Sequence, residues 1–329
     1  MTAFSATPAS ASARPLAGLL PWVLRLALPV LFLLTVLFFA LAAPGFLSGG
    51  NLRSLLLNNF ALLAIVATGL TLAVAAGGID LSVGTALDFA ALAFVVLLNG
   101  GHGLALAVPL ALLAGAAAGA FNAALVAGLG ISPFLATLGT LFIGTSVQQL
   151  LSDGGQPIYL AAAARPALDG WLGLPLPLWI VAALGLAYGL LLARAVAGRQ
   201  ILALGQQPLL AHYSGLPVRR VLTLVFIAGA LASAVAGIVL ASTVHAYVPL
   251  SGNAYLLNAI GAVFIGTTLS RQGRANVAGT LLGVLFLNVV ANGLLLIGWN
   301  FFWQQVATGV LIFAVLAFSL GGRRWLREG

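Results

Sequence analysis

The 329-residue sequence contains no cysteine and no lysine, and only five of its residues are acidic. Without cysteine, the chain forms no disulfide, performs no thiol catalysis and offers no thiolate ligand to a metal. Without lysine, it cannot contain the Gly-x-x-x-x-Gly-Lys-Ser/Thr loop that holds nucleotide phosphates in conventional ATPases. The chain therefore carries no P-loop ATPase site of its own.

Other catalytic signatures are missing as well. The sequence contains neither His-Glu-x-x-His nor Gly-x-Ser-x-Gly, the signatures of zinc proteases and serine hydrolases. The three histidines, His102, His212 and His245, have no carboxylate at the spacing of a metal site. We therefore expect no catalytic residue, no metal site and no cofactor bound by this chain, which makes a membrane enzyme a weak alternative.

Charge of either sign is scarce, and apolar residues dominate. Only 5% of the residues are charged and 62% are hydrophobic, against about 25% charged in an average soluble domain. Lipid is the solvent that tolerates such a surface. The apolar runs are continuous over about 18–25 residues, which fits helices that cross a hydrocarbon core and not the alternating strands of a barrel. The sequence predicts an all-α fold, a polytopic integral membrane helix bundle.

Ten apolar segments follow one another along the chain, and each is long enough to form one transmembrane helix. They cover residues 22–43, 55–76, 81–98, 104–128, 131–151, 175–193, 221–243, 254–270, 275–297 and 301–320. We expect about ten transmembrane helices.

The arginines indicate how these helices are oriented. The net charge is +8, but in a membrane protein arginines are retained in the cytoplasm, so we expect lipid rather than nucleic acid as the partner. If the N-terminus lies in the cytoplasm and the helices alternate, only Arg53 and Arg165 fall outside, and the other eleven lie at or near the cytoplasmic side. This predicts cytoplasmic N- and C-termini and a multi-pass protein of the bacterial inner membrane.

The chain divides into a long membrane domain and two short ends. Residues 1–20, rich in Ser, Ala, Thr and Pro, are expected to be a disordered cytoplasmic N-terminus without a cleavable signal peptide. Residues 21–321 form the predicted transmembrane domain, and residues 322–329 a cytoplasmic tail. Two connections are long: 152–174 outside and 194–220 in the cytoplasm.

The turn between the second and third segments is the most informative stretch. It combines two helix-ending glycines with residues that cap the next helix: Gly77, Gly78, Asp80, Ser82 and Gly84. Asp80 can accept hydrogen bonds from the free amides at the start of that helix. The plain interpretation is a tight, well-capped hairpin; the functional one is a broken helix that lines a permeation path.

A second group of polar residues lies within the apolar segments. A buried carboxylate such as Asp88 costs at least about 2.5 kcal/mol on membrane-insertion scales, so it should face the bundle interior, as a pathway residue or a structural acceptor. Single amides usually join helices, but as a set they indicate a polar, uncharged interior. The candidate pathway residues are Asp88, Asn122, Asn258, Asn288, Asn292 and Gln304.

The cytoplasmic connection 194–220 is predicted to contain a short helix over residues 206–213. Pro208 suits its first turn and Gly215 its end, as read from the sequence. From spacing alone, this helix could lie on lipid or dock on a partner protein.

Several motifs, in order, resemble the sugar-type permeases of bacterial ATP-binding-cassette importers, the group of the ribose, xylose and galactofuranose permeases in the branched-chain permease superfamily. Residues 69–84 match their Gly-Gly-Ile-Asp-Leu-Ser-Val-Gly region closely. Further matches follow at 131–139, 198–205, 214–218, 292–294 and 302–305, so the resemblance covers about residues 50–320. Family members often have Glu and Asp where this chain has Leu256 and Asn258.

The resemblance implies a permease that dimerises with a second copy or a homologous chain. It also implies cytoplasmic ATPase subunits that bind ATP and Mg²⁺, and an extracytoplasmic solute-binding protein. Connection 194–220 would then dock on the ATPase. The residues that carry this over are Arg199, Gly205, Gln207, His212, Ser214 and Gly215.

The expected function is the membrane channel of an importer for a small polar solute, with a monosaccharide favoured. The alternative class is an ion-coupled secondary transporter, for which Asp88 is nearly the sole intramembrane candidate. Within the importer class, a branched-chain amino-acid permease is the other option, although an uncharged interior suits a zwitterion less well.

Overall fold

The computed structural model describes residues 14–166, 170, 173–270 and 272–328, and this part of the chain is almost entirely helical. The long helices are α1 (Arg14–Ala42), α3 (Ala61–Ala75), α4 (Val83–Asn99), α5 (Leu104–Ala123), α6 (Pro133–Leu151), α7 (Leu176–Arg194), α8 (Val196–Gln206), α10 (Val218–Val244), α11 (Asn253–Thr267), α12 (Val277–Leu296) and α13 (Phe301–Glu328). The short ones are α2 (Gly49–Ser54) and α9 (Pro208–Tyr213), with π-helical turns at Leu55–Phe60 (η1) and Ala124–Gly128 (η2) and a 3₁₀ turn at Ala162–Ala164 (η3).

The predicted all-α architecture is confirmed, and each of the ten apolar segments coincides with one helix or one continuous helical run. Among the described residues, six runs are long and apolar enough to cross a membrane, the longest being Gly49–Ala75 and Val218–Val244. The remaining four are shorter apolar helices. That all ten cross the bilayer remains a prediction.

Both ends of the membrane domain differ from the sequence-based boundaries. Helix α1 begins at Arg14, inside the stretch expected to be disordered, and α13 continues to Glu328, so it includes most of the predicted tail 322–329. Pro15 stands in the first turn of α1, where its missing N–H and fixed φ are tolerated. At the other end, residues 323–328 contain no glycine or proline that would favour termination. Residues 1–13 lie outside the described part of the chain.

Helix α3 is at the centre of the bundle. Fourteen of its fifteen residues are buried, which is typical of a helix surrounded by others rather than by lipid. Its Thr71 hydroxyl meets that of Thr280 in α12 at 2.8 Å between the two oxygens. The sequence hydropathy of this helix resembles that of the lipid-facing helices, so its central position could not be read from composition.

Helix α10 packs against α3, α4 and α5 through small residues, which let two backbones approach closely. Gly115 and Gly119 of α5 face Ala234 and Ala230 of α10. Gly237 of α10 lies on the carbonyl of Leu87 in α4. Close contacts at these glycines and alanines thus hold α4, α5 and α10 together as one tightly packed unit.

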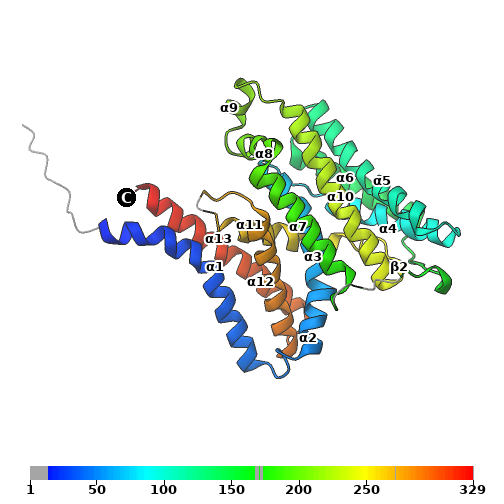
Figure 1. The fold of residues 1–329 in the computed structure, drawn as a ribbon, viewed down its shortest axis with the longest axis horizontal. Coiled ribbons are helices and arrows are strands. Elements are labelled where there is room, and N and C mark those ends of the chain that lie inside the picture. Colours follow the sequence, from blue (N-terminus) through cyan, green and yellow to red (C-terminus); the bar gives the residue numbers. More distant parts are fainter. Residues whose placement is uncertain (1–13, 167–169, 171–172, 271, 329) are drawn as a thin grey trace, which may run out of the picture.

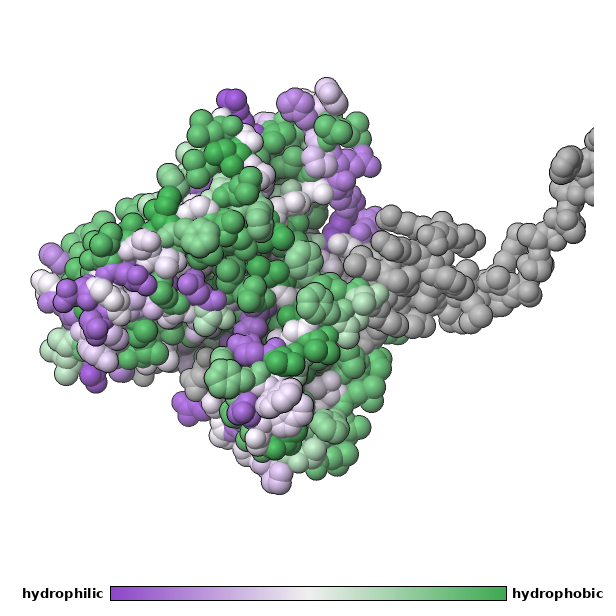
Figure 2. Space-filling view, turned by 180° about the vertical axis from the view of Figure 1, so that it is seen from behind, coloured by the Kyte–Doolittle hydropathy of each residue, from purple (hydrophilic) through white to green (hydrophobic). Residues whose placement is uncertain are grey.

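The outer faces of the bundle are apolar. Leu33 and Leu41 of α1, Phe142 of α6 and Phe313 of α13 are all more than half exposed. Apolar residues cover much of the face in Figure 2, and polar ones gather in patches. A water-soluble protein would have to hide such large apolar areas, whereas lipid hides them in a membrane protein.

Two connections run through the protein interior instead of around it. Residues 76–82 join α3 to α4 without helical structure, and Asp80 and Ser82 within them are buried. Residues 245–252 join α10 to α11, and their strand Ala246–Tyr247 (β2) pairs antiparallel with Ile158–Tyr159 (β1). These connections bring the amino ends of α4 and α11 together, with the backbone of Gly84 against that of Gly252. Non-helical backbone at this depth is tolerated because protein surrounds it.

The connection 194–220, predicted to be cytoplasmic, forms one end of the molecule. Figure 1 shows α8 and α9 side by side at the top, and α2 at the opposite end. The α3–α4 turn also lies at the α8 end, because Gly205 of α8 touches the backbone of Ala75 and Gly77. The α3–α4 turn and the connection 194–220 therefore lie at the same end of the molecule.

Candidate functional site

A cavity of about 280 Å³, which we call the amide cavity, lies between η1, α3, α11, α12 and α13, away from α8 and α9. Four of the six candidate pathway residues line it: Asn258, Asn288, Asn292 and Gln304. The other polar lining residues are Asn59, Gln305 and Thr308. The structure thus brings together side chains that are up to 249 positions apart in the chain, from Asn59 to Thr308.

Helical spacing places these side chains on common faces. Asn288 and Asn292 are one turn apart on α12, and Gln304 and Thr308 are one turn apart on α13. Residues four apart point to the same side of a helix. Each helix therefore presents a pair of polar groups to the cavity, which is why a pattern of isolated amides in the sequence becomes a cluster in space.

A reciprocal amide pair holds one wall of the cavity. The Nδ2 of Asn51 donates to Oδ1 of Asn292, and the Nδ2 of Asn292 donates to Oδ1 of Asn51, both at 2.9 Å. Asn51 also donates to the carbonyl of Phe46 at 2.8 Å. Because Asn51 is in α2, this pair fixes the start of the α2–α3 run against α12.

Three further amides in the cavity make local bonds to backbone. Asn288 donates to the carbonyl of Val284 at 2.9 Å, and Gln304 to that of Trp299 at 2.9 Å. Asn258 makes a long contact of 3.5 Å with the carbonyl of Ala254. These bonds orient the amides without joining them to other side chains of the described residues, so the cavity presents neutral donors and acceptors.

Asp88 lies in a different place from the amide cavity. It is fully buried in α4, and its Oδ1 accepts hydrogen bonds from the backbone N–H of Gly252 and the hydroxyl of Ser251, both at 2.9 Å. Its carboxylate thus sits at the amino end of α11, where the helix dipole favours negative charge. Of the two interpretations of Asp88, this geometry favours the structural acceptor.

Asn122 also lies apart from the amide cavity and belongs to a buried polar chain. Its Nδ2 donates to the Ser82 hydroxyl at 2.6 Å, and its Oδ1 accepts from the Thr140 hydroxyl. The Ser82 hydroxyl in turn donates to Oδ1 of Asp80 at 2.7 Å. This chain ties the α3–α4 turn to α5 and α6, so Asn122 is an interhelical contact.

Asp80 acts as a local acceptor, as expected, although the amide it binds is that of Ser82 itself, at 2.8 Å. Burial raises the pKa of the Asp80 carboxyl above its ordinary value, and the hydrogen bonds from Ser82 oppose that shift. The polar side chains of Asp80 and Ser82 are thus hydrogen-bonded. The turn is a hairpin whose non-helical backbone lies inside the bundle. The structure agrees with the hairpin interpretation, and a role of the turn in lining a permeation path stays a prediction.

The glycines of the turn are sites of close approach. Gly77 adopts a positive φ of +83° and lies against Gly205 of α8, a conformation that suits glycine alone. A Cβ on Gly78 would lie 3.1 Å from the Pro133 side chain, and one on Gly84 2.8 Å from the backbone of Gly252. The turn therefore contacts α6, α8 and α11 at once.

The predicted short helix in the cytoplasmic connection is present as α9, two residues shorter than expected at its start. Arg199, Gln207, His212, Ser214 and Gly215 are exposed. Apolar side chains beside them are exposed as well, with Leu209 at 75% and Tyr213 at 82%. Gly205 differs from these residues, because it packs into the bundle on Ala75 and Gly77.

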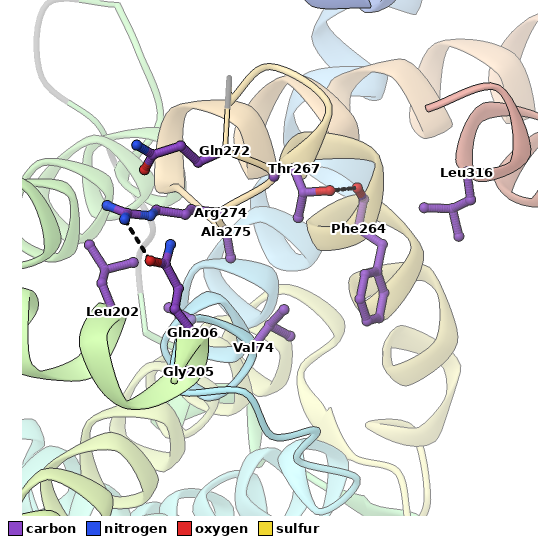
Figure 3. A pocket seen from close by; sticks show the side chains of 12 residues that line it. Val74, Leu202, Gly205, Gln206, Phe264, Thr267, Gln272, Arg274, Ala275 and Leu316 are labelled. Carbon is purple, nitrogen blue, oxygen red and sulfur yellow. Dashed lines mark hydrogen bonds between the residues drawn. The ribbon is translucent and has the colours of Figure 1, made fainter. Parts of the chain in front are cut away.

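A second cavity, of about 500 Å³, lies at the α8 end of the molecule, and we call it the inner cavity (Figure 3). The Nη2 of Arg274 donates to Oε1 of Gln206 at 2.6 Å across it. Thr267, Phe264 and Leu316 form the other side. The sequence argument used Arg274 to orient the helices and missed this contact, because no spacing rule links the α11–α12 connection with α8.

Sequence reasoning also missed Asn59 and Asn51. Two adjacent asparagines at the start of an otherwise apolar segment, residues 58 and 59, were the available signal. Asn51 lay just before the expected helix, so its pairing with α12 depended on the tertiary structure.

The fold and the sites define a polytopic membrane protein with a neutral polar cavity and an exposed connection over residues 194–220, a combination that fits a transport subunit. The family model of the branched-chain amino acid transport system permease component matches residues 52–318. The chain belongs to this permease family. No solved structure matches the fold at a significant level.

Similar proteins of known name are import permeases. The chain is 34% identical over 305 residues to the autoinducer 2 import system permease protein LsrD of Photorhabdus laumondii, covering 89% of this chain and 90% of that one. It is 33% identical over 280 residues to LsrD of Yersinia enterocolitica, with 82% and 84% covered. LsrD of Yersinia pseudotuberculosis is 32% identical over 316 residues, with 93% of each chain covered. The expected importer permease is thus confirmed, and the ion-coupled alternative is not favoured.

Proposed function

We propose that this chain is the translocation subunit of an ATP-driven importer in the bacterial inner membrane, and that it carries a small, uncharged, polar, sugar-like solute. The observation that carries the proposal is the amide cavity, with six amide side chains, one threonine and no charged residue in its lining. A solute rich in hydroxyl groups meets both donors and acceptors there. A zwitterionic amino acid would need fixed charges to compensate its own.

The energy source in this proposal is a separate ATPase that binds ATP and Mg²⁺. The exposed surface of α8 and α9, with its apolar side chains beside Arg199 and His212, is the docking face. Gly205 connects that face to the α3–α4 turn through direct backbone contact, which gives a mechanical path from the partner into the bundle. A second permease chain and an extracytoplasmic binding protein complete the assembly.

The named relatives suggest one particular solute for this chain. Their named solute, autoinducer 2, is a candidate for this chain as well. A binding protein encoded with this chain would identify the solute through ligand screening, and the solute found there would be the one used for transport assays.

The test is uptake by the assembled importer in proteoliposomes, with labelled autoinducer 2 and labelled ribose as probes. Uptake should require ATP on the side of α8 and α9, and it should stop when the catalytic glutamate of the ATPase is replaced. Uptake that continues unchanged with the inactive ATPase would contradict the proposal. Uptake driven by an ion gradient in the purified chain alone would instead support a secondary transporter.

A further inference from the structure

The carboxy ends of three helices meet at the inner cavity. Helix α3 ends at Ala75, α8 at Gln206 and α11 at Thr267, and all three residues line the cavity. The last carbonyl groups of a helix carry partial negative charge, which favours a cation near them. Among the described residues that line the cavity, Arg274 is charged and none is acidic. The three helix ends therefore supply the negative potential that a carboxylate would otherwise provide for this arginine.

The side chain of Arg274 is joined to α8 by a hydrogen bond. Its Nη2 donates to Oε1 of Gln206 at 2.6 Å, and Figure 3 shows the two side chains pointing toward each other. A hydrogen bond with a charged donor is roughly twice as strong as a neutral one. The Nε of Arg274 is buried and has no partner among the described residues. Because a cavity of about 500 Å³ lies beside this bond, the bond can break and re-form without repacking the core.

Arg274 lies in the connection between α11 and α12, two helices that pack as one rigid pair. The backbone of Gly266 in α11 lies directly on that of Gly279 in α12. Asn276, just after Arg274, strengthens this contact because its Oδ1 accepts from the N–H of Gly279 at 2.7 Å. Backbones this close leave little room for one helix to slide on the other. A displacement of Arg274 therefore moves α11 and α12 together.

Helix α8, part of the proposed docking face, has two different links to the bundle. Gly205 packs on the backbone of Ala75 and Gly77 at the α3–α4 turn. The next residue, Gln206, reaches the α11–α12 pair through Arg274. The first link is fixed by backbone packing. The second depends on two side chains, so it is the link that a change in the position of α8 can tighten or release.

Helix α12 extends from this link to the other end of the molecule. It has 20 residues, which span about 30 Å at a rise of about 1.5 Å per residue. Near its far end, Asn292 pairs with Asn51 of α2, and α2 lies opposite α8 and α9 (Figure 1). A movement that begins at α8 can therefore reach the α2 end through one rigid pair of helices.

We propose that Arg274 is the positioning residue that couples the docked ATPase to the α11–α12 pair, because a displacement of α8 moves α11 and α12 through the Arg274–Gln206 hydrogen bond. The inference rests on the proposed function and adds the residue that transmits the ATPase movement. Arg274 contacts neither solute nor nucleotide in this role. Changes at Arg274 should therefore alter the coupling between ATP hydrolysis and uptake, and leave the affinity for ATP unchanged.

Spin labels provide a direct test, because the chain has no native cysteine. Leu257→Cys on α11 and Leu113→Cys on α5 place the labels at side chains that are 74% and 63% exposed. In the assembled importer, with the labelled chain diluted among unlabelled copies, binding of ATP and Mg²⁺ should change the distance between the labels. Arg274→Met should remove most of this change. Uptake of labelled autoinducer 2 or ribose per ATP hydrolysed should fall about fivefold or more, as for a lost allosteric coupling.

Three further variants separate coupling from a general effect on the structure. Gln206→Glu keeps an acceptor for Arg274 and should retain the coupling. Gln206→Met removes that acceptor at an exposed position, so it should uncouple the importer, and it takes the place of Arg274→Met if that variant does not fold. Gln272→Met is the matched control, because Gln272 is exposed and lines the same cavity from the same connection. It should change neither the label distance nor the uptake per ATP.

The coupling role is overturned if a folded Arg274→Met variant keeps both the distance change and the uptake per ATP. It is overturned as well if Gln272→Met lowers both equally, or if ATP does not change the label distance in the importer without these substitutions. The proposed function fails on a different result, which is uptake without ATP by the unsubstituted importer. ATP-dependent uptake together with an unaffected Arg274→Met variant would contradict the coupling role alone.

Discussion

At the scale of single residues, Asp88 shows how a carboxylate is accommodated among apolar helices. One oxygen accepts two hydrogen bonds from Ser251 and Gly252 at the start of α11, and the other oxygen has no partner among the described residues. A negative group at a helix amino end is stabilising. The role of Asp88 in this geometry is to position α11, one wall of the amide cavity.

Replacement of Asp88 should separate this role from one that needs a titrating charge. Asp88→Asn keeps an acceptor oxygen and should retain most of the stability. Asp88→Leu leaves two buried donors unsatisfied and should lower stability by about 1–3 kcal/mol. Thermal unfolding of the purified variants in detergent would measure the difference. Equal losses in the two variants would show that the charge itself is needed and would contradict the positioning role.

The roles of single residues were harder to predict from the sequence than the helices that carry them. Six pathway candidates followed from the rarity of polar groups in apolar segments, and four of them line one cavity. The roles of Asp88 and Asn122 depend on partners in the connections that precede α11 and α4 and in α6. No local pattern specifies such partners, because they are set by how distant helices pack.

At the scale of elements, the α5–α10 contact depends on small residues. Gly119 of α5 lies on the carbonyl of Phe226 and the Cβ of Ala230. Gly139 of α6, also within a helix, has nothing within 4 Å of the position where a Cβ would stand. The two glycines therefore form a matched pair, one with a packing requirement and one without.

Alanine substitutions at these two positions should have opposite effects. Gly119→Ala should destabilise the protein by about 1–3 kcal/mol, because α5 and α10 must move apart. Gly139→Ala should be neutral or stabilising by up to about 1 kcal/mol, because alanine favours the helix. Melting temperatures in the same detergent would compare them. A loss at Gly139 as large as that at Gly119 would rule out close packing as the cause.

The elements themselves were largely predictable. Apolar runs of membrane-spanning length, bounded by glycine and proline, located all ten long helical runs, and Pro208 and Gly215 located α9. Helices α1 and α13 extend beyond the predicted domain bounds, and the connection 245–252, which was expected between two helices, is partly buried. The sequence of a short connection does not show whether it is buried or lies at the surface, so the burial of this one could not be predicted.

At the scale of the whole molecule, the arginines predict the orientation. Three apolar helical runs of membrane-spanning length, those of α5, α6 and α7, lie between His102 and His212. If each crosses the membrane, the two histidines face opposite sides, with His212 on the arginine-rich cytoplasmic side. Both are exposed, so both are suitable positions for labelling.

His102→Cys should react with a membrane-impermeant maleimide in intact cells, and His212→Cys should react only after the membrane is opened. The result follows from an odd number of crossings between the two positions. Denatured samples of each variant would serve as controls for complete labelling. If both cysteines react in intact cells, one of the three intervening helices does not cross the membrane, and the ten-span topology is wrong.

The contact between Gly84 and Gly252 has a consequence for how such a sequence varies over generations. The two backbones touch, so a Cβ on either residue would collide with main-chain atoms of the other. Every other amino acid that ribosomes incorporate at a mutated glycine codon brings at least that one carbon. Neither glycine can therefore be replaced without a further change. A lineage that lost one of them would also have to move the start of α11 away from α4.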